Sequence, residues 1–149
     1  MTERRKAREI AVQTRYEMAQ RGVGFQDPLL ANLERRGGGA AVRAYAERLL
    51  RTLAEHGDEI TSRIAAALSN WSLERVALVD RCILEIGCAE ILYFQDVPMR
   101  VVINEAVEIA KKFSTDESGA FVNGILDRVA RTEATQPRPA DGENLEEGS

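Results

Sequence analysis

The sequence has few aromatic residues, one histidine and two cysteines. Aromatic side chains make up 5% of the 149 residues, whereas Ala, Leu, Glu and Arg are abundant, and this composition favours helices over sheets. The single histidine, His56, excludes a metal site built from several histidines. Cys82 and Cys88 are six positions apart, which is not the spacing of a CxxC redox or zinc motif. We expect both to be small buried thiols.

The motifs of common enzymes and of membrane proteins are also missing. The chain has no GxGxxG or Walker loop, no GxSxG and no HExxH. Asp80, Glu85 and Glu90 follow one expected helix without a histidine or metal-ligand cluster beside them. No apolar run approaches the roughly 18 residues of a membrane span, and the charged N-terminus lacks the apolar segment of a secretory signal. We therefore expect a cytoplasmic protein that is not an enzyme and uses no cofactor or metal.

The formal net charge of −4 is unevenly distributed along the chain. Residues 132–149 hold five acidic residues and one basic residue, so residues 1–131 are neutral overall. The last segment also combines Pro and Gly with an absence of aromatics, which predicts an acidic disordered tail after a folded domain at 1–131. The first 21 residues hold six bases against three acids. We hypothesise that the tail competes with phosphates for this basic segment.

Apolar residues recur every three to four positions along most of the chain, which predicts helices throughout. The expected helices are about 2–20, 27–35, 40–55, 58–68, 73–94, 99–113 and 114–131. Asp27, Asp58, Ser72 and a capping box at 114–117 are the expected helix starts. The 73–94 helix has the broadest apolar face, so we place it at the centre of an all-α bundle of about seven helices.

The first expected helix carries a strip of cations. Arg4, Arg8 and Arg15 are related by 4 and 11 residues and align, with Arg5, Val12 and Tyr16 on the adjacent strip, away from the apolar stripe. An aromatic ring beside guanidinium groups on an outward face is typical of single-stranded RNA binding. The alternative is that Tyr16 packs on a neighbouring helix and the arginines are only solvated. Spacing alone does not decide between them.

Two further residues stand out because their chemistry does not match their position. Phe121 lies at the rim of the apolar stripe of the last helix, near its start, where free N–H groups suit phosphate. Filling a gap between helices is the favoured alternative for this ring. Glu90 falls within the apolar face of the 73–94 helix, where a carboxylate is costly unless it is paired. We expect it to pair with an arginine or to cap a neighbouring helix.

Five segments of the chain carry a recognisable pattern. They are Arg4-Arg5-Lys6-Ala7-Arg8 with Gln13 and Tyr16; Asn70-Trp71 with Leu73 and Arg75; Asp80-Arg81 through Gly87 and Glu90 to Asp96-Val97-Pro98; Ile103-Asn104-Glu105-Ala106-Val107-Glu108-Ile109-Ala110-Lys111; and Phe121-Val122-Asn123-Gly124-Ile125-Leu126-Asp127. Taken in this order they cover about residues 4–131 and resemble the NusB family of transcription antitermination proteins.

The resemblance implies an all-α fold of seven helices in two perpendicular subdomains. It implies binding of boxA, a short single-stranded element of ribosomal RNA transcripts, together with the ribosomal protein NusE in an RNA-polymerase-bound antitermination complex. The implied RNA-binding residues are Arg4, Arg5, Lys6, Arg8, Gln13, Tyr16, Glu117 and Phe121. The implied NusE-binding residues are Asp80, Arg81 and Glu85. Glu117 stands where many relatives carry Asp, and Ala120 where some carry a base.

A helical protein-interaction module without RNA affinity, such as a homodimer or a scaffold, is the alternative function. It predicts that replacing Arg8 by Ala leaves partner binding intact. The RNA-binding interpretation predicts a lower affinity and a shallower dependence on salt.

Overall fold

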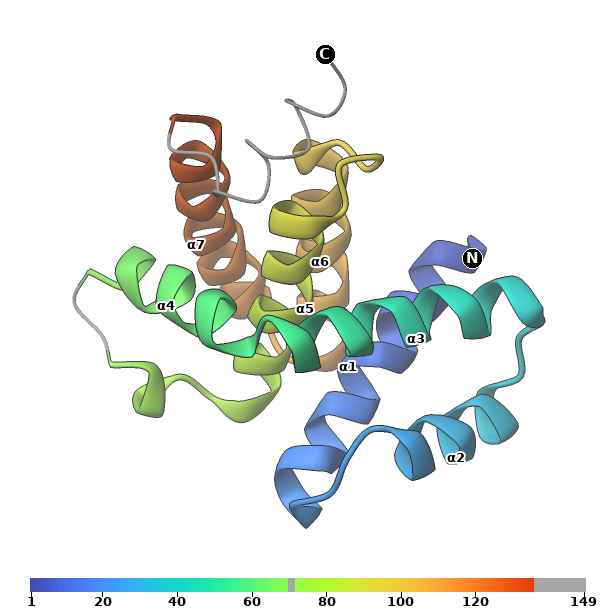
Figure 1. The fold of residues 1–149 in the computed structure, drawn as a ribbon. Helices are drawn as coiled ribbons and strands as arrows, with labels where there is room; N and C mark the ends of the chain where they lie inside the picture. Colours follow the sequence, from blue (N-terminus) through green and yellow to red (C-terminus); the bar gives the residue numbers. More distant parts are fainter. Residues whose placement is uncertain (70–71, 136–149) are drawn as a thin grey trace.

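The computed structural model describes residues 1–69 and 72–135, and all the regular structure in these ranges is helical (Figure 1). The helices are α1 (Glu3–Arg21), α2 (Gln26–Arg36), α3 (Ala40–Glu55), α4 (Gly57–Ala67), α5 (Leu78–Tyr93), α6 (Met99–Phe113) and α7 (Asp116–Thr135), with a short 3₁₀ helix η1 (Leu73–Arg75) before α5. The all-α prediction with seven helices is confirmed. The expected turn at Asn70 and Trp71 lies outside the described residues.

Helix α5 forms the centre of the bundle, as its broad apolar face predicted. It packs against α1, α3, α4, α6 and α7, and twelve of its sixteen residues are buried. Gly87 allows α7 to approach closely, because a Cβ at this position would lie 2.8 Å from Cδ1 of the buried Leu126. Because α5 is packed by five helices, side chains of those helices that bond to it are held in fixed positions.

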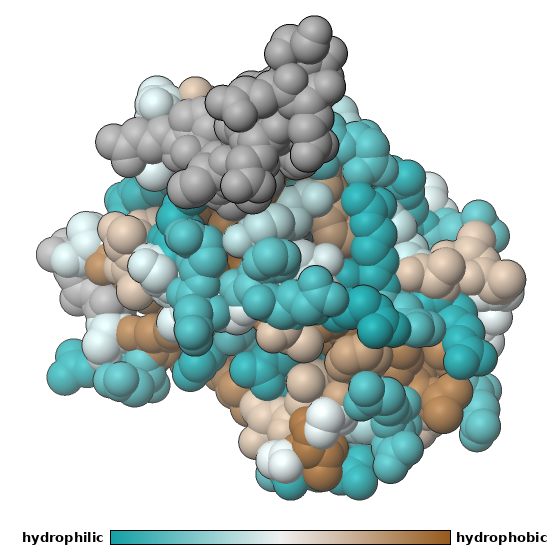
Figure 2. Space-filling model, in the orientation of Figure 1, coloured by the Kyte–Doolittle hydropathy of each residue, from teal (hydrophilic) through white to brown (hydrophobic). Residues whose placement is uncertain are grey.

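The helices form two groups that cross each other. In Figure 1, α5, α6 and α7 run roughly upright, whereas α3 crosses in front of them and α1 and α2 lie towards the lower right. Helix α1 packs against α2 and α3 within one group and against α5 of the other. The crossing agrees with the two perpendicular subdomains implied by the resemblance. Figure 2 shows that the face over α3 and α4 is mostly hydrophilic, with hydrophobic surface gathered at the lower right, where α2 lies below α3.

Several predicted helix starts are wrong by a few residues. Helix α2 begins at Gln26, so Asp27 lies in its first turn rather than at the cap, where its charge still suits the helix dipole. Helix α5 begins at Leu78 instead of 73, because the chain is extended at Val76 after η1. His56, not Asp58, is the cap residue of α4. Ser72 precedes η1 but makes no side-chain capping bond.

The two ends of α7 also differ from the prediction. The Thr115 hydroxyl accepts a hydrogen bond from the Ser118 N–H at 3.0 Å, so Thr115 takes the capping role expected of Ser114 with Glu117. At the other end α7 continues to Thr135, four residues past the predicted domain boundary at 131. The extension is packed, since Glu133 is buried and pairs with Arg63 at 3.2 Å. Residues 136–149, the rest of the predicted acidic tail, lie outside the described residues.

Both cysteines are buried free thiols, as predicted. Burial raises the pKa of the Cys82 thiol to about 12, so it stays protonated and unreactive at neutral pH. Across the described residues, no group of three or more His, Cys, Asp or Glu side chains is placed to hold a metal ion. None of the helices described is both long and apolar enough to cross a membrane.

Candidate nucleic-acid interface

Helix α1 carries most of the residues that the sequence singled out, and its ends are well defined. The Thr2 hydroxyl accepts a hydrogen bond from the Arg5 N–H at 3.0 Å and caps the start. Gly22 ends the helix in the left-handed conformation, with φ of 67°. Between these ends, the stretch from residue 7 to residue 12 is buried. The helix is therefore a fixed platform, and its side chains divide into those that face α5 and α6 and those that face solvent.

Arg8 faces the interior, so its predicted place on an outward strip is wrong. Its guanidinium group donates to both carboxylate oxygens of Glu90, at 2.7 and 2.8 Å, and its side chain is 5% exposed. The Tyr45 hydroxyl donates to the same carboxylate at 2.7 Å. Burial lowers the pKa of Arg8, but the hydrogen bonds and charge of Glu90 outweigh it and raise the pKa overall. The predicted pairing of Glu90 with an arginine is confirmed.

Two more arginines of α1 are turned towards carboxylates of neighbouring helices. Arg5 donates to both oxygens of Glu105 on α6, at 2.5 and 2.6 Å, and these bonds raise the pKa of Arg5 and lower that of Glu105. Arg15, also predicted to face outward, lies 2.9 Å from Glu85 on α5, and its side chain is 21% exposed. These pairs tie α1 to the second group of helices. The strip of cations is therefore largely structural.

Other cations on and around α1 remain accessible to solvent. The Arg4 side chain is 51% exposed and lies 3.7 Å from Asp96. Lys6 is half-buried, and its ammonium group lies beside Gly37, where α2 ends. The structure thus separates the first four predicted RNA-binding cations: Arg4 and Lys6 reach the surface, and Arg5 and Arg8 are held by carboxylates.

A buried acid, Glu9, brings two further cations over α1 that the sequence did not reveal. Arg36 of α2 donates to its carboxylate at 2.7 Å, and the Lys112 ammonium of α6 does so at 3.0 Å. Glu9 is 1% exposed, whereas the Lys112 side chain is 47% exposed. Arg36 also donates to the Gln13 side-chain oxygen at 2.8 Å. One feature of the sequence could have revealed this cluster. Glu9 lies next to Ile10 of the buried stripe, and a buried carboxylate requires cationic partners.

Tyr16 completes this face of α1. It is 40% exposed, so of the two alternatives left open by the sequence, full packing against a neighbouring helix does not apply. Arg5, Glu9 and Tyr16 are separated by four and seven residues, so they lie along one strip of the helix. The strip presents an accessible ring beside the cations that Glu9 holds. Such a ring and neighbouring cations are suited to a stacked base and its phosphate.

Phe121 lies near the start of α7 and forms a wall of two surface hollows. One, of about 200 Å³, is shared with Arg75, Val76, Ala77 and Asp80. The other, of about 290 Å³, lies on the side of Gly124 and Arg128. The ring is partly buried and also packs against the core. Phe121 therefore fills a gap between helices and is exposed at the surface as well. Glu117 is exposed one turn before it.

The predicted partner-binding residues occupy different environments. Asp80 is 8% exposed, and its Oδ2 accepts a hydrogen bond from the Ser118 hydroxyl at 3.0 Å. Its other oxygen, Oδ1, is buried and has no hydrogen-bond partner among the described residues. The Glu85 side chain is 4% exposed and faces Arg15 and Arg81. Only Arg81, at 33%, reaches solvent appreciably.

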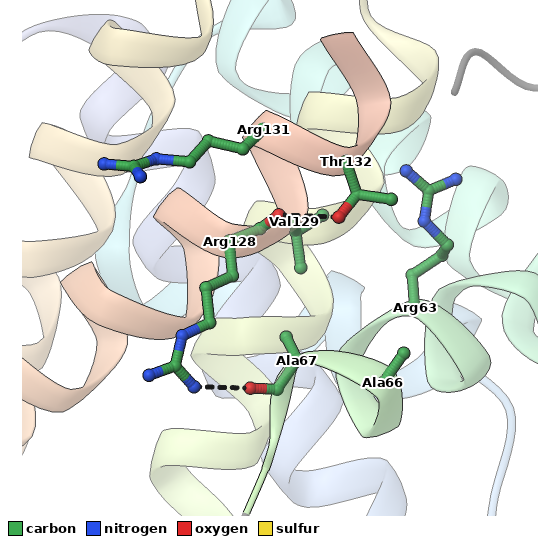
Figure 3. A pocket seen from close by; sticks show the side chains of 7 residues that line it. All are labelled: Arg63, Ala66, Ala67, Arg128, Val129, Arg131 and Thr132. Atoms are coloured by element: carbon green, nitrogen blue, oxygen red, sulfur yellow. Dashed lines mark hydrogen bonds between the residues drawn. The ribbon is translucent and has the colours of Figure 1, made fainter. Parts of the chain in front are cut away.

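A larger hollow of about 500 Å³ lies between α4 and α7 and is lined by three arginines (Figure 3). The guanidinium groups point in different directions in the figure. Each already has a partner: Arg63 pairs with Glu133, Arg128 donates to the Ala67 carbonyl at 2.8 Å, and Arg131 pairs with Asp127 on its own helix. These arginines do not converge on a common point, so the candidate interface is the surface around α1.

The chain is similar to known proteins over most of its length. The sequence profile of the NusB family matches residues 5–131. The chain belongs to the NusB family. It is 47% identical over 132 residues to the transcription antitermination protein NusB of Methylacidiphilum infernorum, covering 88% of this chain and 92% of that protein. It is 45% identical to NusB of Geobacter sulfurreducens, covering 89% and 96%.

Solved NusB structures share the fold. T. maritima NusB superposes with a TM-score of 0.80 at 35% identity, covering 88% of this chain and 92% of that one. A crystal structure of the antitermination factors NusB and NusE in complex with double-stranded RNA gives a TM-score of 0.81 at 27% identity, covering 89% and 98%. The predicted membership of the NusB family is thus confirmed over nearly the whole folded part of the chain.

Proposed function

We propose that this protein is a transcription antitermination factor that binds boxA-type single-stranded RNA of ribosomal RNA transcripts together with the ribosomal protein NusE. It would act in an RNA-polymerase-bound antitermination complex. The observation that carries the proposal is the strip on α1 where exposed Tyr16 lies in line with Glu9, which holds the 47% exposed Lys112 together with the less exposed Arg36. Family membership supports the proposal, as does the related NusB structure that contains NusE and RNA.

The RNA contacts divide according to exposure. Tyr16 and Phe121 contact bases, because aromatic faces stack on unpaired bases without sequence restriction. Phosphates meet the accessible cations, which are Arg4, Lys6 and Lys112, whereas Arg36 is 20% exposed and mainly holds Glu9. Gln13 adds a side-chain amide next to Arg36. Arg5 and Arg8 act indirectly, since their bonds to Glu105 and Glu90 fix α1 against α6 and α5.

NusE binds at the hollow that Phe121 shares with Asp80. The unpaired Oδ1 of Asp80 belongs to a carboxylate that is more than nine-tenths buried and lines this hollow. A buried acceptor without a donor is unfavourable, so a cationic or N–H group of NusE that enters the hollow gains a charge-assisted hydrogen bond. Arg81, the residue after Asp80 in α5, is 33% exposed and is accessible to the same partner. Phe121 lines this hollow as well, so RNA and NusE meet there, and each raises the affinity of the other.

Fluorescence anisotropy with a labelled boxA-type RNA tests the proposal. The RNA is titrated with the protein, with and without NusE, against a scrambled strand and a duplex of the same sequence. We expect NusE to increase the affinity for the boxA strand more than for the other two probes. Equal affinity for all three would reject sequence recognition. No binding of any probe would leave the alternative, a helical protein-interaction module such as a homodimer.

A matched pair of variants assigns the binding to the Tyr16 strip. Tyr16 on α1 and Leu30 on α2 are 40% and 44% exposed, so either can be replaced by Ala with little loss of packing. We expect Tyr16→Ala to weaken RNA binding and Leu30→Ala to leave it unchanged. Equal effects of the two replacements would place the RNA elsewhere.

A further inference from the structure

A second cationic site lies at the N-terminal end of α1, on the side that faces α3. Arg4 of α1 and Arg48 of α3 flank an open hollow of about 360 Å³, with Tyr45 between them. Their side chains are 51% and 44% exposed. Twelve residues separate Arg4 from Tyr16, which is about 18 Å along the helix. The hollow is therefore outside the Tyr16 strip but within reach of a few additional nucleotides.

The Arg48 guanidinium group is held in a fixed orientation. Its central carbon lies 3.7 Å from the centroid of the Phe94 ring, which is 1% exposed. One of its nitrogens donates to Asp96 at 3.1 Å. A guanidinium group stacked on a buried ring loses little freedom when it binds an anion, and its planar fork suits a phosphate. Arg4 lies over the Tyr45 ring at 4.8 Å and faces the same hollow.

The carboxylate of Asp96 is the shared counter-ion of the two arginines. It lies 3.7 Å from Arg4 and 3.1 Å from Arg48, and it is 52% exposed. The hydrogen bond from Arg48 lowers the pKa of Asp96 despite the opposing effect of burial, so the group is ionised at neutral pH. Exposed ion pairs contribute little to stability, so an incoming anion can replace this carboxylate. Glu3 is the acid that lines the hollow itself, whereas Asp96 reaches the two arginines from outside its lining.

We infer that Arg4 and Arg48 form a phosphate-binding site that extends the RNA path from α1 onto α3, with Asp96 as a counter-ion that the RNA backbone displaces. The inference rests on the proposed RNA-binding function. It adds a residue of α3, Arg48, to the RNA-binding surface and gives Asp96 an inhibitory role. The ligand is a backbone phosphate of RNA that flanks the boxA element, so this site increases affinity without reading sequence.

Three variants test the site by anisotropy with a boxA-type RNA that carries flanking nucleotides on both sides, in the presence of NusE. Arg48→Ala should weaken binding about threefold to tenfold at low salt and reduce the slope of log K against log salt by about 0.7, the value for one phosphate of a single strand. Asp96→Asn keeps the shape and a hydrogen-bond acceptor but removes the charge, so it should tighten binding about twofold to fivefold. The matched control is Arg51→Ala, which removes another exposed arginine of α3, 57% exposed against 44% for Arg48, that pairs with Glu47 and does not line the hollow.

The outcomes separate this inference from the proposed function. Opposite effects of Arg48→Ala and Asp96→Asn, with no effect of the control, support the site, and tighter binding by Asp96→Asn cannot result from misfolding. If the wild type binds the RNA and neither variant differs from it, the site is wrong and the proposed function stands. Equal losses for Arg48→Ala and Arg51→Ala would show only a general effect of charge, which also overturns the site. If the wild type itself binds no RNA, the proposed function fails, and the site, which rests on it, is overturned with it.

Discussion

Arg4 and Arg8 lie one turn apart on α1, yet their environments are opposite. The Arg8 side chain is 5% exposed and holds a buried carboxylate with two hydrogen bonds, whereas that of Arg4 is 51% exposed and lies 3.7 Å from an exposed one. The two residues have the same charge and are only four positions apart in the sequence. The difference shows that a basic helix can serve two purposes at once. Its inward arginines join the helices, and its outward cations are available to a ligand.

Replacing Arg8 should have the largest effect on stability. Arg8→Ala leaves Glu90 buried with only the Tyr45 hydroxyl as a partner, and loss of one member of a buried ion pair costs about 3–5 kcal/mol. Arg4→Ala, the matched control, should change the free energy of unfolding by less than about 0.5 kcal/mol, as exposed positions do. Urea denaturation followed by circular dichroism measures both. Similar losses for the two variants would contradict the division of α1.

The Tyr45 hydroxyl tests the same network with a smaller change. Tyr45→Phe keeps the ring on which Arg4 lies but removes the 2.7 Å hydrogen bond to Glu90. A hydrogen bond to a charged group contributes about 1.5–3 kcal/mol, so the unfolding midpoint in urea should fall by a corresponding amount. An unchanged midpoint would mean that Arg8 alone satisfies Glu90.

On the outward side, Tyr16 should affect binding and not folding. Stacking of a base on an aromatic ring contributes about 1–3 kcal/mol, so Tyr16→Ala should weaken boxA RNA binding about fivefold to a hundredfold. Its free energy of unfolding should match that of the wild type, since the ring is 40% exposed. Parallel anisotropy and urea titrations on the same preparation separate the two effects. A loss of stability as large as the loss of affinity would make Tyr16 structural.

The weakest expected effect concerns the pH dependence of the Arg5–Glu105 pair. The pKa of Glu105 lies below its ordinary value of 4.5, chiefly because Arg5 donates hydrogen bonds to it. The ionised carboxylate therefore stabilises the fold fully above pH 4.5, and this contribution is lost as the pH falls from there through the lower pKa of the folded state. The advantage of the wild type over Glu105→Gln should be constant near neutral pH and shrink in acid. Urea midpoints between pH 7 and about 3 would reveal a constant difference if the pair did not contribute.

Parts of the fold follow from the sequence because they depend on local spacing. The broad apolar face of the 73–94 segment predicted the central helix, and Glu90 within that face predicted a buried ion pair. The start of α5 was placed too early, because the apolar pattern continues through Val76 although the chain there is extended. The spacing of apolar residues shows which side chains are buried, but it does not show where a helix begins.

The candidate site was less predictable because its contacts join distant segments. Arg8 reaches a carboxylate 82 residues away, and Val12, expected on the outward side one turn further on, is 2% exposed, so this side of α1 packs inward as well. Glu9 binds Arg36 and Lys112, which are 27 and 103 residues away. Tyr16 lies away from the apolar stripe, but spacing left open whether its ring packs on a neighbouring helix, and the structure shows it 40% exposed. Which cations are structural and which are free depends on packing that spacing does not encode.

The division of α1 is tested most directly by the salt dependence of RNA binding after removal of two accessible cations. Arg4 and Lys6 are replaced together by Ala, and boxA RNA binding with NusE is measured by anisotropy at several salt concentrations. The slope of log K against log salt should become shallower by about 1.4, which is two phosphate contacts of a single strand, while the urea midpoint stays close to that of the wild type. An unchanged slope would contradict the assignment of this face to RNA.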